Sequence, residues 1–301
     1  MDIYLPIAEL PVNLFLVLGL GGAVGFLSGM FGVGGGFLMT PLLILLGVPA
    51  AVAVATQAPQ ILASSVSGVL AQFRRKAVDV KMGWVLVAGG LVGSFVGVSV
   101  FAWLKRLGHV DLFVSAAYVL FLGTVAALML SESLGALWRS RRPAAAPRRR
   151  QHSWAHRWPL KVRFPTSRLY ISAFLPLAVG AFGGLLAAIL GIGGGFVMIP
   201  AMIYIIRMPS GVVIGTSLFQ ICFVSAATTF LHAYENGTVD ILLALLLIAG
   251  GVVGAQFGTR AGTYLRGEQL RILLAAMVLL VCAKLAWDLV VAPVDPYTVT
   301  Q

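Results

Sequence analysis

The feature that most constrains the fold of this chain is a motif that occurs twice. Gly32-Val33-Gly34-Gly35-Gly36-Phe37 recurs as Gly191-Ile192-Gly193-Gly194-Gly195-Phe196, each time between two apolar runs. The halves stay aligned beyond the glycines, and the matched pairs are Met39 and Met198, Pro41 and Pro200, Pro49 and Pro209, Thr56 and Thr216, Gln60 and Gln220, and Asp79 and Asp240. Hydrophobic segments interrupted by glycine at corresponding positions of two halves indicate the binding site of a transporter.

The composition places this chain in a membrane. Of its 301 residues, 59% are hydrophobic and only 10% are charged, whereas a soluble domain carries about 25% charged residues. Apolar runs near the ~20 residues that a helix needs to cross a bilayer recur along the sequence. We therefore predict an all-α polytopic membrane protein with segments at 11–30, 37–48, 50–73, 83–104, 111–131, 169–190, 196–206, 210–233, 241–260 and 270–290.

The basic residues predict the topology. Ten of the 21 Lys and Arg residues lie between Arg139 and Arg168, where no acidic residue occurs. The positive-inside rule makes this linker cytoplasmic, and contact with anionic lipid, rather than with nucleic acid, explains its charge. If all ten segments cross, 18 basic residues face the cytoplasm, and Lys105 and Arg106 are the clear exceptions.

Five crossings in each half make the halves inverted relative to each other. The expected organisation is a first transmembrane repeat over 1–136, a basic linker over 137–168 and a second repeat over 169–301. Each repeat contains one helix broken by glycine, and the protein is expected in the inner (plasma) membrane. The glycine-rich fourth segments permit a homodimer without requiring one.

The glycine runs are candidates for anion binding. They expose backbone N–H groups without side chains, and each is followed by a helix whose positive dipole end points back at them. The substrate-binding residues predicted here are Gly34, Gly35, Gly36, Gly193, Gly194 and Gly195. The alternative is that glycine only allows helices to pack closely, and this better explains Gly93, Gly97, Gly250, Gly254 and Gly258.

Neutral polar side chains follow each glycine motif. The candidates for substrate binding are Thr56, Gln57 and Gln60 in the first half and Thr216, Ser217 and Gln220 in the second. Thr56 and Gln60 are four residues apart, so they share one helix face, and they can donate to an oxyanion without adding charge. The alternative is that these groups bond to neighbouring helices or to their own backbone.

The sequence disfavours several other functions. Neither motif is followed by Lys-Ser or Lys-Thr, which excludes a nucleotide-binding loop, and the two cysteines and four histidines lack metal-ligand spacing. We therefore expect no bound metal and no cofactor. We also expect no enzymatic activity, because no nucleophile–base pair is visible in the membrane segments. No Asp or Glu lies in the middle third of an expected segment, so the buried carboxylates of proton-coupled relays are missing.

The paired glycine motifs, the short segments interrupted by proline, Thr56 with Thr216 and the basic central linker resemble the TauE/SafE family of sulfite and organosulfonate exporters. The resemblance covers about residues 10–295. It implies a permease that exports small sulfur-containing anions such as sulfite or short organosulfonates. The alternatives are a channel or uptake permease for another small anion, such as thiosulfate or sulfate, and a non-transporting membrane assembly protein.

Overall fold

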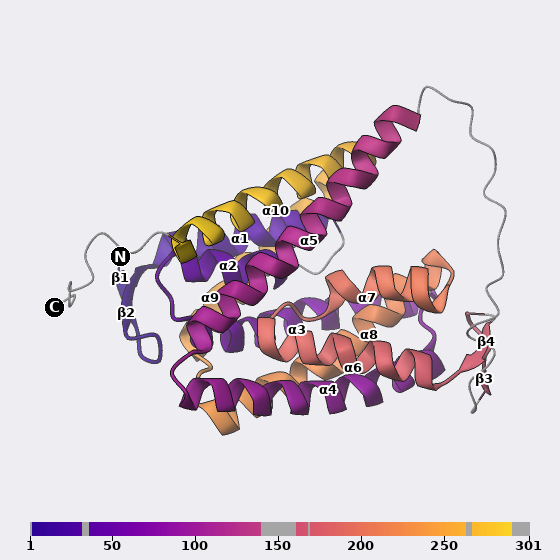
Figure 1. Ribbon diagram of the computed structural model, residues 1–301, viewed down its shortest axis with the longest axis horizontal. Coiled ribbons are helices and arrows are strands. Elements are labelled where there is room, and N and C mark those ends of the chain that lie inside the picture. The colour runs from indigo at the N-terminus through magenta and orange to yellow at the C-terminus, as the bar shows by residue number, and fades with distance from the viewer. Residues whose placement is uncertain (1, 32–35, 140–160, 168, 263–266, 291–301) are drawn as a thin grey trace.

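The computed structural model describes residues 2–31, 36–139, 161–167, 169–262 and 267–290 (Figure 1). In this part of the chain the helices are α1 (Leu14–Phe31), α2 (Gly36–Leu45), α3 (Ala50–Arg74), α4 (Val80–Arg106), α5 (Val110–Arg139), α6 (Phe174–Leu190), α7 (Gly195–Ala201), α8 (Ser210–Leu231), α9 (Ile241–Gly262) and α10 (Gly267–Val290). Two π-helical turns, η2 (Met202–Ile206) and η3 (His232–Asn236), continue α7 and α8.

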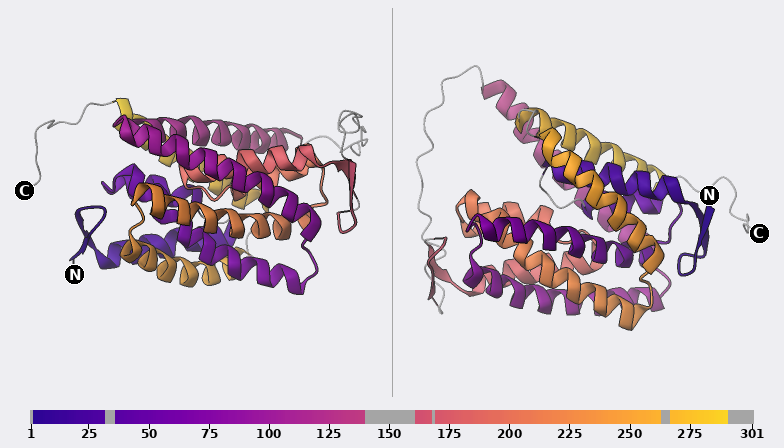
Figure 2. Two further views of the ribbon diagram at one scale, coloured as in Figure 1. Left: turned by 90° about the horizontal axis from the view of Figure 1, so that it is seen from below. Right: turned by 180° about the vertical axis from the view of Figure 1, so that it is seen from behind.

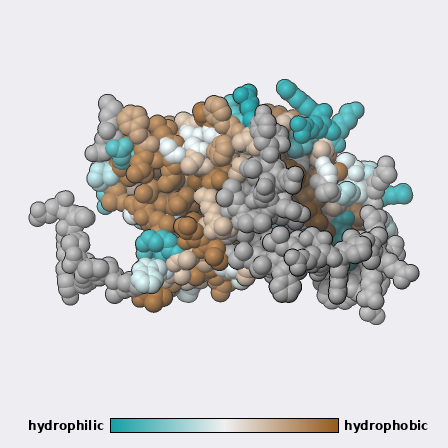
Figure 3. Space-filling model, turned by 90° about the horizontal axis from the view of Figure 1, so that it is seen from above, coloured by the Kyte–Doolittle hydropathy of each residue, from teal (hydrophilic) through white to brown (hydrophobic). Residues whose placement is uncertain are grey.

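The expectation of an all-α membrane protein is confirmed. Each of the ten expected segments overlaps a helix of the described chain, and three stretches are long and apolar enough to cross a bilayer: Val80–Arg106, Gly211–Asn236 and Ile241–Gly258. Figure 3 shows a broad hydrophobic band on one face of the molecule, with hydrophilic residues at its margins. Such a band is what a lipid bilayer requires of the surface that it contacts.

Two short β-hairpins were not expected from the sequence. Strands β1 (Asp2–Leu5) and β2 (Leu10–Asn13) pair antiparallel before α1, and β3 (Lys161–Phe164) and β4 (Leu169–Ser172) pair in the same way before α6. The starts of the expected helical segments 11–30 and 169–190 are therefore strands. The two hairpins lie at opposite ends of the molecule (Figures 1 and 2).

Helices from different halves of the chain form the closest pairs. Helix α1 packs along α9, and α4 packs along α6. Glycine makes both contacts possible, because a Cβ atom on Gly254 would overlap the carbonyl oxygen of Gly22, and one on Gly93 would overlap that of Ala181. The packing role expected for Gly93, Gly97, Gly250, Gly254 and Gly258 is thus confirmed, since an added Cβ at each would meet a neighbouring helix.

This packing predicts opposite effects for two glycine substitutions. Gly254→Ala should lower the Tm of the detergent-solubilised protein, because overpacking a tight contact costs about 1–3 kcal/mol. Gly19→Ala, on the exposed face of α1 with nothing within 4 Å of an added Cβ, should leave the Tm unchanged or raise it, because alanine favours helix. A Gly254→Ala protein as stable as the wild type would contradict the packing argument.

Candidate functional site

Helix α6 is broken by a buried glycine turn. It ends at Leu190, and Gly191, Gly193 and Gly194 then adopt left-handed conformations with φ of 65°, 70° and 73°. This region favours glycine because a side chain would clash with the backbone. All residues from 191 to 195 are buried, and α7 starts at Gly195, so the chain changes direction inside the protein.

The second glycine motif meets the start of α2. A Cβ atom on Gly36 would lie 2.9 Å from the carbonyl oxygen of Ile192. Ile61 of α3 fills the space between the motifs, because its side chain would overlap a Cβ on Gly36 and would come within 2.6 Å of one on Gly193. The two predicted glycine sites are therefore brought together, although Gly34 and Gly35 lie outside the described residues.

The carbonyl end of the broken helix α6 is capped by side chains from distant helices. The Tyr118 hydroxyl donates to the carbonyl oxygen of Leu190, and Nε2 of His232 lies 3.0 Å from that of Ala188. The amide of Asn236 donates to Nδ1 of His232 at 3.0 Å, so Nε2 carries the imidazole proton and donates it to Ala188. These two carbonyl groups already accept hydrogen bonds.

Sequence reasoning missed both capping residues. His232 was dismissed because no other ligand lies at metal spacing, and Tyr118 is one aromatic residue in an apolar helix. Both are fully buried, and each contacts a residue far away in the sequence. The signal available in the sequence was a histidine at the end of an expected membrane segment, 210–233.

Three predicted glutamines are buried between helices, two of them beside glycines of α9 and α4. Gln57 donates to Gln60 within α3, and Nε2 of Gln60 would be 2.7 Å from a Cβ on Gly251 of α9. On the other side, Nε2 of Gln220 would be 2.9 Å from a Cβ on Gly90 of α4. All three side chains are buried.

Two of these amides keep free capacity for a ligand. Among the described residues, Oε1 of Gln57 and Oε1 of Gln220 have no hydrogen-bond partner. An amide presents either a donor or an acceptor when it turns by half a revolution. The interior of the described protein thus contains neutral amide groups whose hydrogen bonds are incomplete.

The predicted hydroxyl groups are engaged elsewhere. Oγ1 of Thr56 accepts the N–H of Asp240 at 3.0 Å, and Oγ1 of Thr216 accepts the N–H of Asp79 at 3.0 Å. Ser217 donates to the carbonyl oxygen of Ile214 in its own helix at 3.0 Å. In this structure the three hydroxyls therefore bond to neighbouring segments or to their own helix, which is the alternative to substrate binding considered in the sequence analysis.

Each aspartate of the Thr–Asp pairs also holds a hairpin. Asp79 caps α4 by accepting the N–H of Met82 at 3.1 Å, and its other oxygen accepts from the N–H and hydroxyl of Ser167 at 2.9 and 2.6 Å. We name Asp79, Thr216 and Ser167 the Asp79 latch.

The other end of the molecule repeats this arrangement. Asp240 accepts the N–H of Leu243 at 3.1 Å and that of Ile7 at 3.1 Å. We name Asp240, Thr56 and Ile7 the Asp240 latch. Both carboxylates are buried, and each latch joins residues of one half to residues of the other. The alignment of Asp79 with Asp240 was visible in the sequence, but its meaning was not.

Removing the latch hydroxyls should destabilise the protein. Thr56→Val and Thr216→Val keep the side-chain shape but leave a buried N–H without an acceptor, which costs about 1–3 kcal/mol. Thr228→Val is the matched control, because the Thr228 hydroxyl is buried and lacks a partner among the described residues. We expect a lower Tm for the first two variants and no decrease for the control; equal Tm values for all three would contradict the role of the latches.

Comparison with known proteins identifies the family of this chain. The chain is 30% identical over 253 residues to a probable membrane transporter protein of Xylella fastidiosa (strain 9a5c), covering 83% of this chain and 85% of that protein. It is 27% identical over 284 residues to the probable membrane transporter protein YunE of Bacillus subtilis (strain 168), covering 91% and 97%. No solved structure matches it. The family model described as sulfite exporter TauE/SafE matches residues 17–285, and the chain therefore belongs to the TauE/SafE family of membrane transporters.

Proposed function

We propose that this membrane transporter exports a small sulfur-containing anion, sulfite or a short organosulfonate, from the cytoplasm. The observation that carries the proposal is the meeting of the two glycine motifs inside the protein, where Gly36 adjoins Ile192. Backbone N–H groups at such a junction suit an anion. The buried amides of Gln57, Gln60 and Gln220 add neutral groups that can bind oxyanion oxygens.

The proposed architecture is a pair of inverted repeats, 1–136 and 169–301, joined by a cytoplasmic linker over 137–168 that contacts anionic lipid of the inner membrane. Three observations support it. A hairpin followed by five helices occurs twice in the described chain. The first helix of each half packs against the fourth helix of the other half, as α1 on α9 and α6 on α4, and the two hairpins lie at opposite ends (Figure 1). In this topology the Asp79 latch faces the cytoplasm and the Asp240 latch faces outside.

The latches give this architecture a way to alternate access. Residues 191–195 are buried while both latches are formed, so an anion reaches the glycine junction only after the halves separate at one end. Opening the Asp79 latch admits the anion from the cytoplasm, and opening the Asp240 latch releases it outside. Each motion leaves the other latch closed, as rocking around a central site requires.

The membrane potential supplies the driving force in this proposal. Each negative charge that leaves a cell with a negative interior gains ~2.3 kcal/mol per 100 mV. The carbonyl groups of Ala188 and Leu190, which lie at the end of a broken helix where transporters often bind a coupling cation, are capped by His232 and Tyr118. Export without a coupled ion is therefore the simplest scheme.

Flux measurements test the substrate and the site together. Proteoliposomes are loaded with labelled sulfite, sulfoacetate, thiosulfate or sulfate, and efflux is followed under a set membrane potential. Gly193→Ala places a Cβ against Ile61 at a left-handed φ, so we expect loss of saturable flux. Gly211→Ala, with nothing within 4 Å of its added Cβ, is the control and should transport normally.

The outcomes separate the parts of the proposal. Saturable efflux of sulfite or sulfoacetate, lost only in Gly193→Ala, supports both the substrate class and the site. Efflux of thiosulfate or sulfate alone would overturn the proposed substrate class. Unchanged flux in Gly193→Ala would show that the anion does not bind at the glycine junction. Efflux that follows an imposed pH gradient at zero potential would overturn the uncoupled scheme.

The latches predict separable motions at the two hairpins. Asp79→Asn removes the charge that strengthens the hydrogen bonds from Ser167, and it should speed amide hydrogen exchange in β3 and β4 but not in β1 and β2. Asp240→Asn should do the reverse. Exchange measured by mass spectrometry on the detergent-solubilised proteins checks this, and faster exchange at both hairpins in either variant would show that the latches do not open independently.

A further inference from the structure

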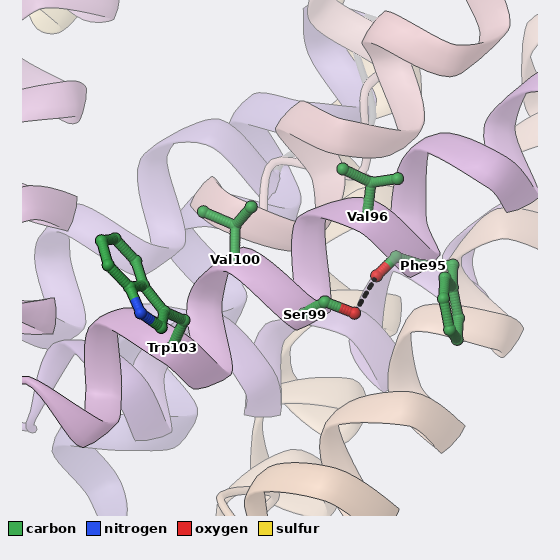
Figure 4. A pocket seen from close by; sticks show the side chains of 5 residues that line it. All are labelled: Phe95, Val96, Ser99, Val100 and Trp103. Atoms are coloured by element: carbon green, nitrogen blue, oxygen red, sulfur yellow. Dashed lines mark hydrogen bonds between the residues drawn. The ribbon is translucent and has the colours of Figure 1, made fainter.

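Two adjoining shallow pockets, both open to the outside of the protein, lie along the outer face of α4. The first, of about 380 Å³, is apolar and is lined by Phe95, Val96, Ser99, Val100 and Trp103. Figure 4 shows these side chains spread along the helix, with Phe95 near one end and Trp103 at the other. The second, of about 710 Å³, shares Ser99 and Trp103 with the first and continues to the end of the helix. Together they form one groove with an apolar part and a polar part.

The polar part presents both signs of charge. Lys105, Arg106 and Glu235 line it together with Asn236. Among the described residues, the ion pair within 4 Å is Lys284 with Asp288. The Glu235 carboxylate and the Arg106 guanidinium therefore line the same pocket without forming an ion pair. The Lys105 ammonium donates to the carbonyl oxygen of Asn236 at 2.7 Å, which holds it at the rim of this pocket.

The polar and apolar parts of the groove are arranged as the headgroup and acyl chain of a lipid are. Its polar part lies where α4 ends at Arg106, and Trp103 beside it is 62% exposed, as aromatic residues are at the level of lipid headgroups. Its apolar part extends from Trp103 back to Phe95, eight residues or about 12 Å along the helix. An occupant of matching shape has a charged head at the helix end and a hydrocarbon chain directed toward the membrane centre.

We propose that this groove binds a zwitterionic phospholipid. The phosphate is held by Lys105 and Arg106, the amine by the Glu235 carboxylate, and one acyl chain lies along Val96, Val100 and Phe95. An anionic lipid would satisfy the two basic residues but would leave Glu235 facing a negative headgroup. The pairing of both charges in one ligand is therefore what selects a phosphate that carries an amine. It also gives Lys105 and Arg106, the basic residues that break the positive-inside pattern, a ligand of their own.

Native mass spectrometry tests the charge assignment. The full chain is reconstituted in nanodiscs that contain equal amounts of palmitoyl-oleoyl phosphatidylethanolamine and phosphatidylglycerol, and the lipids retained on release are counted. We expect the wild type to retain phosphatidylethanolamine in preference. Glu235→Gln should lower the preference about two- to fivefold, the effect of an exposed ion pair. Asp288→Asn, an exposed acidic residue away from the groove, should not change it.

Two further variants make the test decisive. Glu235→Lys should reverse the preference toward phosphatidylglycerol, because the polar part of the groove is then wholly basic. Trp103→Ala should reduce the number of retained lipids, whereas Trp287→Ala should not, although Trp287 is similarly exposed at 65%. Equal retention of both lipids by the wild type, or equal losses in the two tryptophan variants, would overturn the proposal.

Discussion

Two buried carboxylates determine how the halves of this protein fit together. The side chains of Asp79 and Asp240 each cap a long helix and also accept a hydrogen bond from a hairpin. The backbone N–H of each aspartate donates to a threonine hydroxyl from the other half. Buried polar groups in a membrane protein must find partners inside the protein, since lipid offers none. These aspartates satisfy several backbone N–H groups at once, so the position of each hairpin depends on them.

The same constraint explains how a helix is interrupted inside the protein. A break frees carbonyl groups that would be costly without partners. His232 and Tyr118 supply the missing donors at the end of α6, and Asn236 fixes the imidazole in the required tautomer. The glycine turn is therefore held by polar side chains on one side and by Ile61 on the other. Supported in this way, the turn interrupts the helix without leaving its last carbonyl groups unpaired.

Much of this fold was predictable because hydrophobic length and glycine position are local signals. The ten segments and the packing glycines, such as Gly93 and Gly254, were read from such signals. The hairpins were not, because Leu169–Ser172 adjoins an apolar helix in the sequence and forms a strand by pairing with Lys161–Phe164. At the site, the two glycine breaks were visible in the sequence. The use of Thr56 and Thr216 to bind aspartate N–H groups was not, since it depends on contacts between residues more than a hundred positions apart.

The exchanged helix pairs have a consequence for biosynthesis. The glycine face of α1 packs against α9, which the ribosome makes only near the end of the chain. Until then this face has no native partner, and the first five helices cannot form a finished domain. The fold of this protein thus requires both halves of the chain. A half-length protein with this sequence pattern would leave the glycine face of its first helix uncovered unless a second chain packed against it.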